Sequence, residues 1–280
     1  MERFAVKGIF VDTPTPNTLR VRDGYMLCED GRCGAFREAA PAGVPVYDHS
    51  GQIITPGFVD LHLHAPQYSY CGTAMDLELL DWLNTITFPQ EARYEDTDFA
   101  REAYSIFAED MKKSPNTRAC IFGTLHVPAT EILMELLDKT GMKTMVGKVN
   151  MDRNGSPLLQ EESAKASADA TISWIEDTLT KFENVTPILT PRFTPSCSDE
   201  LMKRLSEIQK KYHLPMQSHL SENFGEIACV KELCPATHFY GEAYSQFGLF
   251  GGDCPTVMAH CVHSSDEEIA LMKKQGVYIA

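Results

Sequence analysis

Four histidines of this 280-residue sequence stand where short β-prone runs end. His62 and His64 form a His-x-His pair, and His219 and His260 close two later runs. Residues two apart on a strand point the same way, so the imidazoles of His62 and His64 can reach one ion. Imidazole suits zinc, and three protein ligands with an open position are typical of a catalytic metal site. A single His-x-His pair is more often a polar pair in a core, but four histidines at three run ends indicate a metal site.

A carboxylate follows one of these histidines. Glu222 lies three residues after His219, where it could take a proton from an activated water and pass it on. The alternative is a glutamate favoured by the positive end of a helix dipole, which is our interpretation of Glu226. We prefer proton transfer for Glu222 because it is closer to His219.

Lys148 and Arg192 bear on the number of metal ions. Barrels with two metals bridge them through a modified lysine, and Lys148 ends the third expected strand. The fourth strand offers Arg192, which cannot be deprotonated for such a role, so one metal is predicted. His126 and His263 lie just beyond strand ends, where they are either structural or support a ligand by a hydrogen bond. The remaining histidines are expected in turns or at helix ends: His49, His213 and His238.

These residues need elements that bring them together. Strands are expected over 53–63 (buried, and broken by Pro56-Gly57), 118–125, 143–149, 185–190, 215–219 and 256–260, with another beginning at 276. Helices are expected over 97–113, 129–139, 161–182, 199–212 and 222–233, with one more opened by a capping box at Ser265–Glu268.

Strands that alternate with helices predict a parallel α/β sheet. A doubly wound open sheet has the same rhythm, but no glycine-rich phosphate loop follows any strand. We therefore predict a (β/α)8 TIM-type barrel that is incomplete, with about six units and the start of strand 7, and with active side chains at the carboxyl ends of its strands. The turn-rich first fifty residues predict a β layer. The expected domains are 1–54, part of a small β-sandwich, and 55–280, the incomplete barrel.

Bulk composition excludes several kinds of partner. The net charge of −14 disfavours a nucleic-acid polymer. No run is long and apolar enough for a membrane span, and we expect no signal peptide. Nine cysteines without a paired CxxC spacing favour free thiols and a cytoplasmic protein over disulfides or a zinc ribbon.

Several separated motifs resemble one known family. The run PGFVDLHLH at 56–64 resembles the first-strand signature of the amidohydrolase superfamily. Within it, the guanine deaminases are the most similar branch. The segments that carry this likeness are HLHAPQY at 62–68, DWL at 81–83 with TFP at 87–89, VGKV at 146–149, TPRF at 190–193 and QSHLSEN at 217–223. The resemblance runs from about residue 53 to residue 280.

The resemblance implies a reaction, the zinc-dependent hydrolysis of guanine to xanthine and ammonia in purine catabolism. His62, His64 and His219 would hold one zinc ion per chain, although imidazole suits iron as well. Glu222 would carry protons between water and the ring nitrogen N3, and His260 would orient the water or stabilise the tetrahedral oxygen. The implied substrate-binding residues are His64, Ala65, Pro66, Gln67, Arg192, Phe193, His219 and Glu222.

The implied specificity rests on hydrogen bonds. Arg192 and Gln67 would donate to the exocyclic oxygen of guanine, which adenine lacks, and a site built around such a bond rejects rings without it. The His-x-Glu and Pro-Cys-x-x-Cys motifs of the cytidine-type zinc deaminases do not occur here.

One ligand of the superfamily pattern has no counterpart here. An aspartate at the end of the eighth strand normally binds the metal and the water, whereas this sequence ends at Ala280, inside the seventh strand. We therefore expect a C-terminally truncated fragment of a longer protein that forms a homodimer when full length. The alternatives are a sister amidohydrolase acting on a triazine or an adenosine derivative, or a fragment that is a non-catalytic metal-binding remnant.

Overall fold

The structure is a computed structural model that describes residues 3–280. It divides into two compact units, of which the first ends at Phe58 and the second runs from Val59 to Ala280. The division thus falls four residues beyond the boundary expected from the sequence. The assignment of the first unit to a small β-sandwich stays a prediction.

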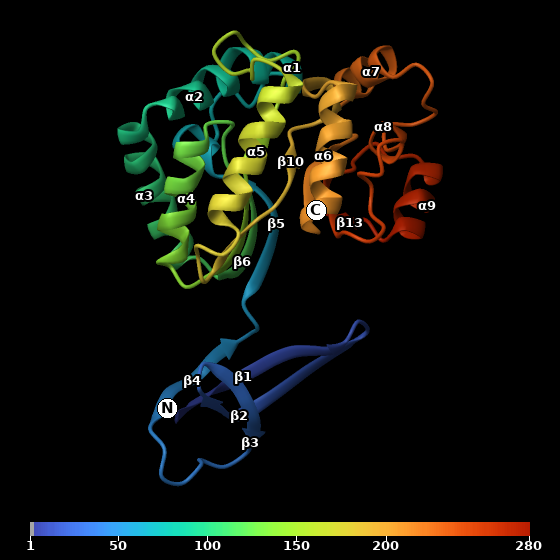
Figure 1. Cartoon of the computed structure of the whole chain (residues 1–280). Coiled ribbons are helices and arrows are strands. Elements are labelled where there is room, and N and C mark those ends of the chain that lie inside the picture. The colour runs from blue at the N-terminus through green and yellow to red at the C-terminus, as the bar shows by residue number, and fades with distance from the viewer. Residues whose placement is uncertain (1–2) are drawn as a thin grey trace. The chain divides into compact units, whose positions relative to one another are not determined.

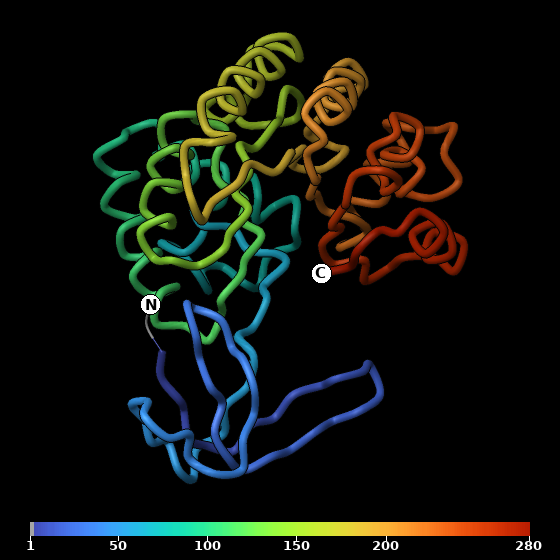
Figure 2. The backbone as a smooth tube through the Cα atoms, turned by 60° about the horizontal axis from the view of Figure 1, so that its bottom comes forward, coloured from blue at the N-terminus to red at the C-terminus, as the bar shows by residue number. Residues whose placement is uncertain are grey.

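The first unit is a four-stranded sheet in the order β3-β2-β1-β4. Its strands are β1 (Arg3–Thr15), β2 (Thr18–Glu29), β3 (Arg32–Arg37) and β4 (Val46–Ile54). The antiparallel strands β1 and β2 form the long hairpin seen in Figure 2. The turn between β2 and β3 contains Asp30 and Gly31 with φ of 51° and 73°, a backbone that Asp-Gly adopts readily.

The expected break at Pro56-Gly57 is confirmed, but the expectation of one buried strand over 53–63 is wrong, because one strand ends at Ile54 and another begins at Phe58. Ile53 and Ile54 end β4 and pair with Ile9 and Phe10 of β1. Pro56 lies in the break between the strands, and proline cannot donate to a sheet ladder. The next strand begins at Phe58, which is 55% exposed rather than buried.

The second unit contains parallel strands that follow one another in chain order. The strands are β5 (Phe58–His64), β6 (Asn116–Phe122), β7 (Lys143–Gly147), β8 (Val149–Asn150), β9 (Val185–Pro187), β10 (Thr190–Pro191), β11 (Met216–Leu220), β12 (Thr256–His260) and β13 (Tyr278–Ile279). They form sheets ordered β5-β6-β7-β9, β10-β8 and β11-β12-β13. An isolated parallel bridge joins Met216 of β11 to Leu189, which lies between β9 and β10. This α/β order is that of a TIM-type barrel.

Helices separate the strands and cover the outside of the second unit (Figure 1). They are α1 (Leu79–Trp82), α2 (Phe88–Ala92), α3 (Thr97–Lys113), α4 (Val127–Asp138), α5 (Ala164–Thr178), α6 (Asp199–Tyr212), α7 (Phe224–Leu233), α8 (Glu242–Ser245) and α9 (Asp266–Gln275). Short 3₁₀ turns are η1 (Ala65–Tyr70), η3 (Arg93–Glu95) and η4 (Thr194–Ser196), and η2 (Leu83–Thr87) is a π-helical turn.

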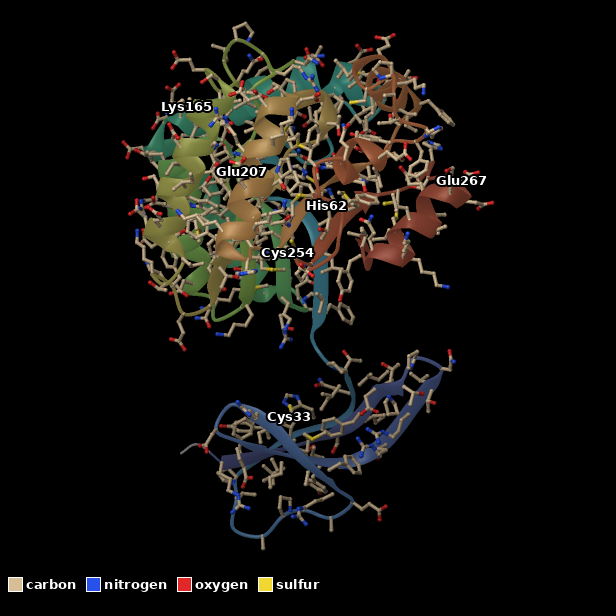
Figure 3. All side chains as sticks on the ribbon, turned by 45° about the vertical axis from the view of Figure 1, so that its right-hand side comes forward. Cys33, His62, Lys165, Glu207, Cys254 and Glu267 are labelled. Atoms are coloured by element: carbon tan, nitrogen blue, oxygen red, sulfur yellow. The ribbon has the colours of Figure 1, made fainter. Side chains whose placement is uncertain are left out.

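The helices bury an apolar face against the strands and leave charged side chains outside. Lys165 and Glu207 are exposed on α5 and α6, whereas His62 lies inside the second unit (Figure 3). The core between the layers includes Ile121, Leu133 and Trp174, all fully buried. No helix within residues 3–280 is long and apolar enough to cross a membrane.

The expected capping box of α9 forms only in part. Ser265 accepts a hydrogen bond from the Glu268 backbone N–H at 3.2 Å. The Glu268 carboxylate does not close the box, because it accepts from the Ser221 hydroxyl at 3.0 Å and from the Gly241 backbone N–H. This glutamate therefore ties α9 to the loop that follows β11.

Candidate metal and substrate site

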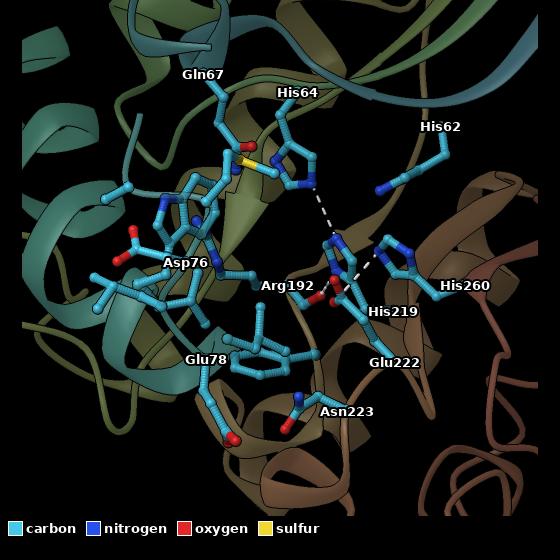
Figure 4. A pocket seen from close by; sticks show the side chains of 17 residues that line it. His62, His64, Gln67, Asp76, Glu78, Arg192, His219, Glu222, Asn223 and His260 are labelled. Atoms are coloured by element: carbon cyan, nitrogen blue, oxygen red, sulfur yellow. Dashed lines mark hydrogen bonds and ion pairs between the residues drawn. The ribbon is translucent and has the colours of Figure 1, made fainter. Parts of the chain in front are cut away.

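The four histidines singled out by their spacing meet at the carboxyl ends of their strands. His62 and His64 come from β5, His219 from β11 and His260 from β12. The ring centroid of His62 lies 5.1, 4.9 and 5.0 Å from those of His64, His219 and His260. One nitrogen each of His62, His219 and His260 lie within 4.8 Å of one another. Nε2 of His64 lies 2.9 Å from Nε2 of His219 (Figure 4).

Burial keeps these imidazoles neutral. It lowers the pKa of His62 to about 3, with a further contribution from His260. Burial likewise holds the pKa of His64 and His219 well below the ordinary value, and it lowers that of His260. A neutral imidazole has the lone pair that a metal ion requires.

The backbone selects the tautomer of His219. Its Nδ1 lies 2.6 Å from the carbonyl oxygen of Arg192, and because a carbonyl can only accept, Nδ1 donates. Nε2 then carries the lone pair and faces the other histidines. A metal-binding histidine is commonly oriented in this way by a hydrogen bond from its other nitrogen.

The spacing of His64 and His219 fits a zinc ion. Two nitrogens that each lie about 2.0–2.1 Å from one zinc are roughly 3 Å apart, and the Nε2 atoms of His64 and His219 are separated by 2.9 Å. Nδ1 of His64 is buried without a hydrogen-bond partner among the described residues, so no hydrogen bond from Nδ1 to these residues fixes the orientation of this ring.

Glu222 lies beside this cluster on the loop between β11 and α7. Its Oε2 is 3.3 Å from Nε2 of His260. Burial, followed by the nearby Glu226, raises the pKa of Glu222 to about 7, so both protonation states are accessible near neutral pH. Geometry and pKa are therefore those required of a group that accepts and returns a proton.

Backbone hydrogen bonds to Glu226 fix the loop that carries Glu222. Ser221 has a left-handed φ of 50°, and Oε2 of Glu226 accepts from the backbone N–H of Glu222 at 2.9 Å and of Asn223 at 3.3 Å. The interpretation of Glu226 as a helix N-terminal residue is confirmed, since it completes a capping box with Asn223 at the start of α7.

A cavity of about 530 Å³ opens beside the histidines. Eight residues singled out from the sequence line it: His62, His64, Gln67, Arg192, Phe193, His219, Glu222 and His260. Ala65 and Pro66, which were also expected at the substrate, are not among the described residues that line this cavity. Both are buried, and the Pro66 carbonyl accepts a hydrogen bond from the Tyr94 hydroxyl at 2.9 Å. Residues 74–79, Trp82, Leu83 and Asn223 also line the cavity; of these, the sequence analysis gave a site role to none, although Trp82, Leu83 and Asn223 lie in segments that carry the family resemblance.

Arg192 and Gln67 share a partner that sequence reasoning also missed. Nη1 and Nη2 of Arg192 donate to Oε2 and Oε1 of Glu91 at 2.6 and 3.2 Å. Nε2 of Gln67 donates to Oε1 of the same carboxylate at 3.3 Å. Glu91 is 1% exposed. Its only sequence signal is its place two residues after the Thr87-Phe88-Pro89 segment.

Lys148 is engaged away from the histidines. It is fully buried between β7 and β8 and forms an ion pair with Glu161. The Glu161 carboxylate also accepts from the Met151 backbone N–H at 3.0 Å. This pairing gives Lys148 a structural partner in place of a metal.

The other histidines lie outside the cavity. His126 precedes the first turn of α4, and His263 stacks on Phe224 with ring centroids 4.0 Å apart. Neither His126 nor His263 is among the described residues that line the cavity. A hydrogen bond from either of them to a metal ligand stays a prediction. The expectation that His49 lies in a turn is wrong, because it lies within β4, where Nδ1 is 2.9 Å from Oε1 of Gln52.

Neutral imidazoles and a carboxylate at the carboxyl ends of parallel strands define the class of metal-dependent barrel proteins. The chain belongs to the amidohydrolase family, whose model matches residues 53–280.

Relatives within this family indicate a narrower likeness. The chain is 42% identical over 260 residues to the guanine deaminase of Dictyostelium discoideum, covering 92% of this chain and 56% of that protein. It is 44% identical to the crystal structure of guanine deaminase from C. acetobutylicum with bound guanine, with a TM-score of 0.95, covering 99% of this chain and 67% of that one. The chain thus spans a little over half the length of the first of these relatives.

More distant structures share the fold alone. A mutant of atrazine chlorohydrolase from Arthrobacter aurescens, complexed with zinc and atraton, has a TM-score of 0.84 at 15% identity. That match covers 99% of this chain and 64% of the other.

Proposed function

We propose that the protein catalyses the hydrolytic deamination of guanine to xanthine and ammonia with zinc. The observation that carries this proposal is the cavity in which four neutral imidazoles and Glu222 face Arg192, Gln67 and Phe193. The 44% identity to a guanine deaminase with guanine bound supports the choice of substrate.

His62, His64 and His219 are the proposed holders of one zinc ion per chain. Zinc, when bound, activates a water molecule for attack by lowering its pKa to about 7. His260 is proposed to orient the water, because its Nε2 lies 3.3 Å from the Glu222 carboxylate and both groups line the same cavity, where both can hydrogen-bond to one water.

Glu222 moves the protons. It takes one from the attacking water and delivers it to the ring nitrogen N3, where charge builds as the aromatic system is broken. It then takes the remaining proton of the attacking oxygen and transfers it to the amine, which leaves C2 as ammonia while that oxygen becomes the second carbonyl of xanthine. Near neutral pH both steps are accessible, because the pKa of Glu222 is about 7.

Arg192, Gln67 and Phe193 hold the ring. Arg192 is 2% exposed and supplies guanidinium donors from inside the cavity wall. Phe193 is 5% exposed and lines the cavity, and its ring centroid lies 6.4 Å from that of His219, so a flat ring bound in the cavity would have an apolar contact beside the histidines. The oxygen on C6 of guanine is the acceptor that the Arg192 donors require, whereas the amide nitrogen of Gln67 already donates to Glu91.

The test is turnover of guanine by the zinc-loaded protein, measured as xanthine and ammonia. The expected result is equal amounts of both products, with no comparable turnover of an aminotriazine or an adenosine derivative. Turnover of one of those rings without turnover of guanine would establish the sister activity instead, and zinc binding without any turnover would establish a metal-binding remnant.

Two further features belong to the same proposal. The second unit is taken as the larger part of a (β/α)8 barrel, since its strand order is that of such a barrel, and the first unit as part of a small β domain. The protein is taken to act as a homodimer on a small-molecule purine.

A further inference from the structure

Glu91 is a buried carboxylate with no part in the proposed chemistry. It lies on α2, which directly follows the π-helical turn η2. Such turns are rare and are found mostly at functional sites. Glu91 does not line the cavity, within the described residues, but its two nearest polar partners, Arg192 and Gln67, both do.

The contacts of Glu91 determine how Gln67 is oriented. Both oxygens of Glu91 accept hydrogen bonds from Arg192, and the Gln67 group 3.3 Å from Oε1 is the amide nitrogen, which donates to it. The amide oxygen Oε1 is then the group that Gln67 offers to the cavity. Gln67 and His64 enter the cavity from the same side in Figure 4.

The same carboxylate determines what Arg192 offers. The fork of two bonds, Nη1 to Oε2 and Nη2 to Oε1, uses one N–H of each terminal nitrogen and fixes the guanidinium plane. The arginine carbon Cζ also lies 5.0 Å from the Phe88 ring centroid. The remaining N–H groups of the Arg192 guanidinium can only donate hydrogen bonds, because arginine has no acceptor atom.

One donor from Arg192 and one acceptor from Gln67 match a particular ring edge. A lactam, a carbonyl next to a ring N–H, presents an acceptor and a donor, whereas an amino group next to an unprotonated ring nitrogen presents the reverse. We propose that Glu91 is a positioning residue that fixes Arg192 and Gln67 as a donor–acceptor pair selective for the lactam edge of an oxopurine. This inference rests on the proposed function, and it adds to it the residue that sets the specificity.

The test is binding of hypoxanthine and of unsubstituted purine, measured by calorimetry with the zinc-loaded protein. Hypoxanthine has the lactam edge but lacks the 2-amino group, and purine has neither, so the comparison requires no turnover. We expect the wild-type protein to bind hypoxanthine at least tenfold more tightly than purine. Glu91→Gln, which can donate as well as accept and so releases the Gln67 amide, should reduce this ratio by about tenfold, toward equal binding of the two ligands.

The matched control is Glu95→Gln, the same change four residues along at an exposed position, and it should keep the wild-type ratio. An unchanged ratio in Glu91→Gln, or equal weakening of both ligands, would overturn the inference, because a purely structural carboxylate would affect both alike. If Glu91→Gln does not fold, Gln67→Met keeps the Arg192–Glu91 pair and removes the acceptor. A wild-type ratio in Gln67→Met would overturn the inference equally.

The outcomes separate this inference from the proposed function. Selective binding of hypoxanthine that depends on Glu91, without guanine turnover, would contradict the function and leave the inference standing. Guanine turnover with a ratio that does not depend on Glu91 would contradict the inference alone.

Discussion

Replacing Glu222 by glutamine removes the proposed proton carrier with almost no change of shape. Positioned proton transfer typically contributes about 10²- to 10⁴-fold to a rate, which is roughly 2.7–5.4 kcal/mol of barrier. With a pKa of about 7, the carboxyl group is about half ionised at pH 7, so its protonation costs the wild-type protein only about a factor of two. We therefore expect kcat of Glu222→Gln to fall by about 10²- to 10⁴-fold.

Substrate affinity should change little, because Arg192 and Gln67 hold the ring edge away from Glu222. The assay is steady-state release of xanthine from guanine, with zinc content and melting temperature measured on the same preparations. Glu232→Gln, an exposed glutamate later on α7, is the matched control and should behave as wild type. A Glu222→Gln protein that binds zinc and keeps kcat within about threefold of wild type would refute the assignment of proton transfer to Glu222.

Three further changes test the supporting structure. Lys148→Met leaves the Glu161 carboxylate without its buried partner. We expect it to lower the free energy of unfolding, measured in urea, by about 3–5 kcal/mol and to leave the zinc content unchanged. Loss of zinc would instead indicate that Lys148 is a ligand. Burial raises the pKa of Glu226, so the native state holds this proton more tightly than the unfolded chain, and stability should fall as pH rises above about 4.5. Glu226→Gln should flatten that fall, and parallel curves for the two proteins would contradict the assignment. Zinc at 100 times its Kd should stabilise the wild-type protein by about 2.7 kcal/mol and His219→Ala by far less, whereas equal stabilisation would exclude His219 as a ligand.

Elements with strong local signals could be predicted closely. Helix α6 spans Asp199–Tyr212 as expected, because Ser198 caps its start through the Leu201 N–H and His213 ends it with a left-handed φ of 51°. Strand β12 likewise spans Thr256–His260. Such signals are local in sequence, and they were sufficient to place His219 and His260 at strand ends.

The stretch between β5 and α3 could not be predicted in the same way. It holds short 3₁₀ and π-helical turns over residues 65–95, which have no regular apolar period for a pattern to reveal. This stretch also supplies Glu91 and much of the cavity wall. Glu91 and Arg192 are 101 residues apart in sequence, so their contact follows from the fold of the unit and not from any local spacing.

Long-range pairing also explains the interrupted strand near residue 148. The apolar run over 143–149 predicts one strand, but it divides into β7 and β8 at Lys148. This side chain is directed into the interior, where Glu161 neutralises it. A buried lysine requires such a partner, and nothing near it in the sequence identifies which glutamate that would be.

The most direct measurement of the central claim is guanine turnover by the zinc-loaded protein before and after removal of the metal with a chelator. We expect xanthine and ammonia in equal amounts from the loaded protein, no product after chelation, and recovery when one equivalent of zinc is returned. Undiminished turnover in the metal-free protein, or no conversion of guanine by the zinc-loaded protein, would contradict the assignment of this histidine cluster to zinc-dependent deamination.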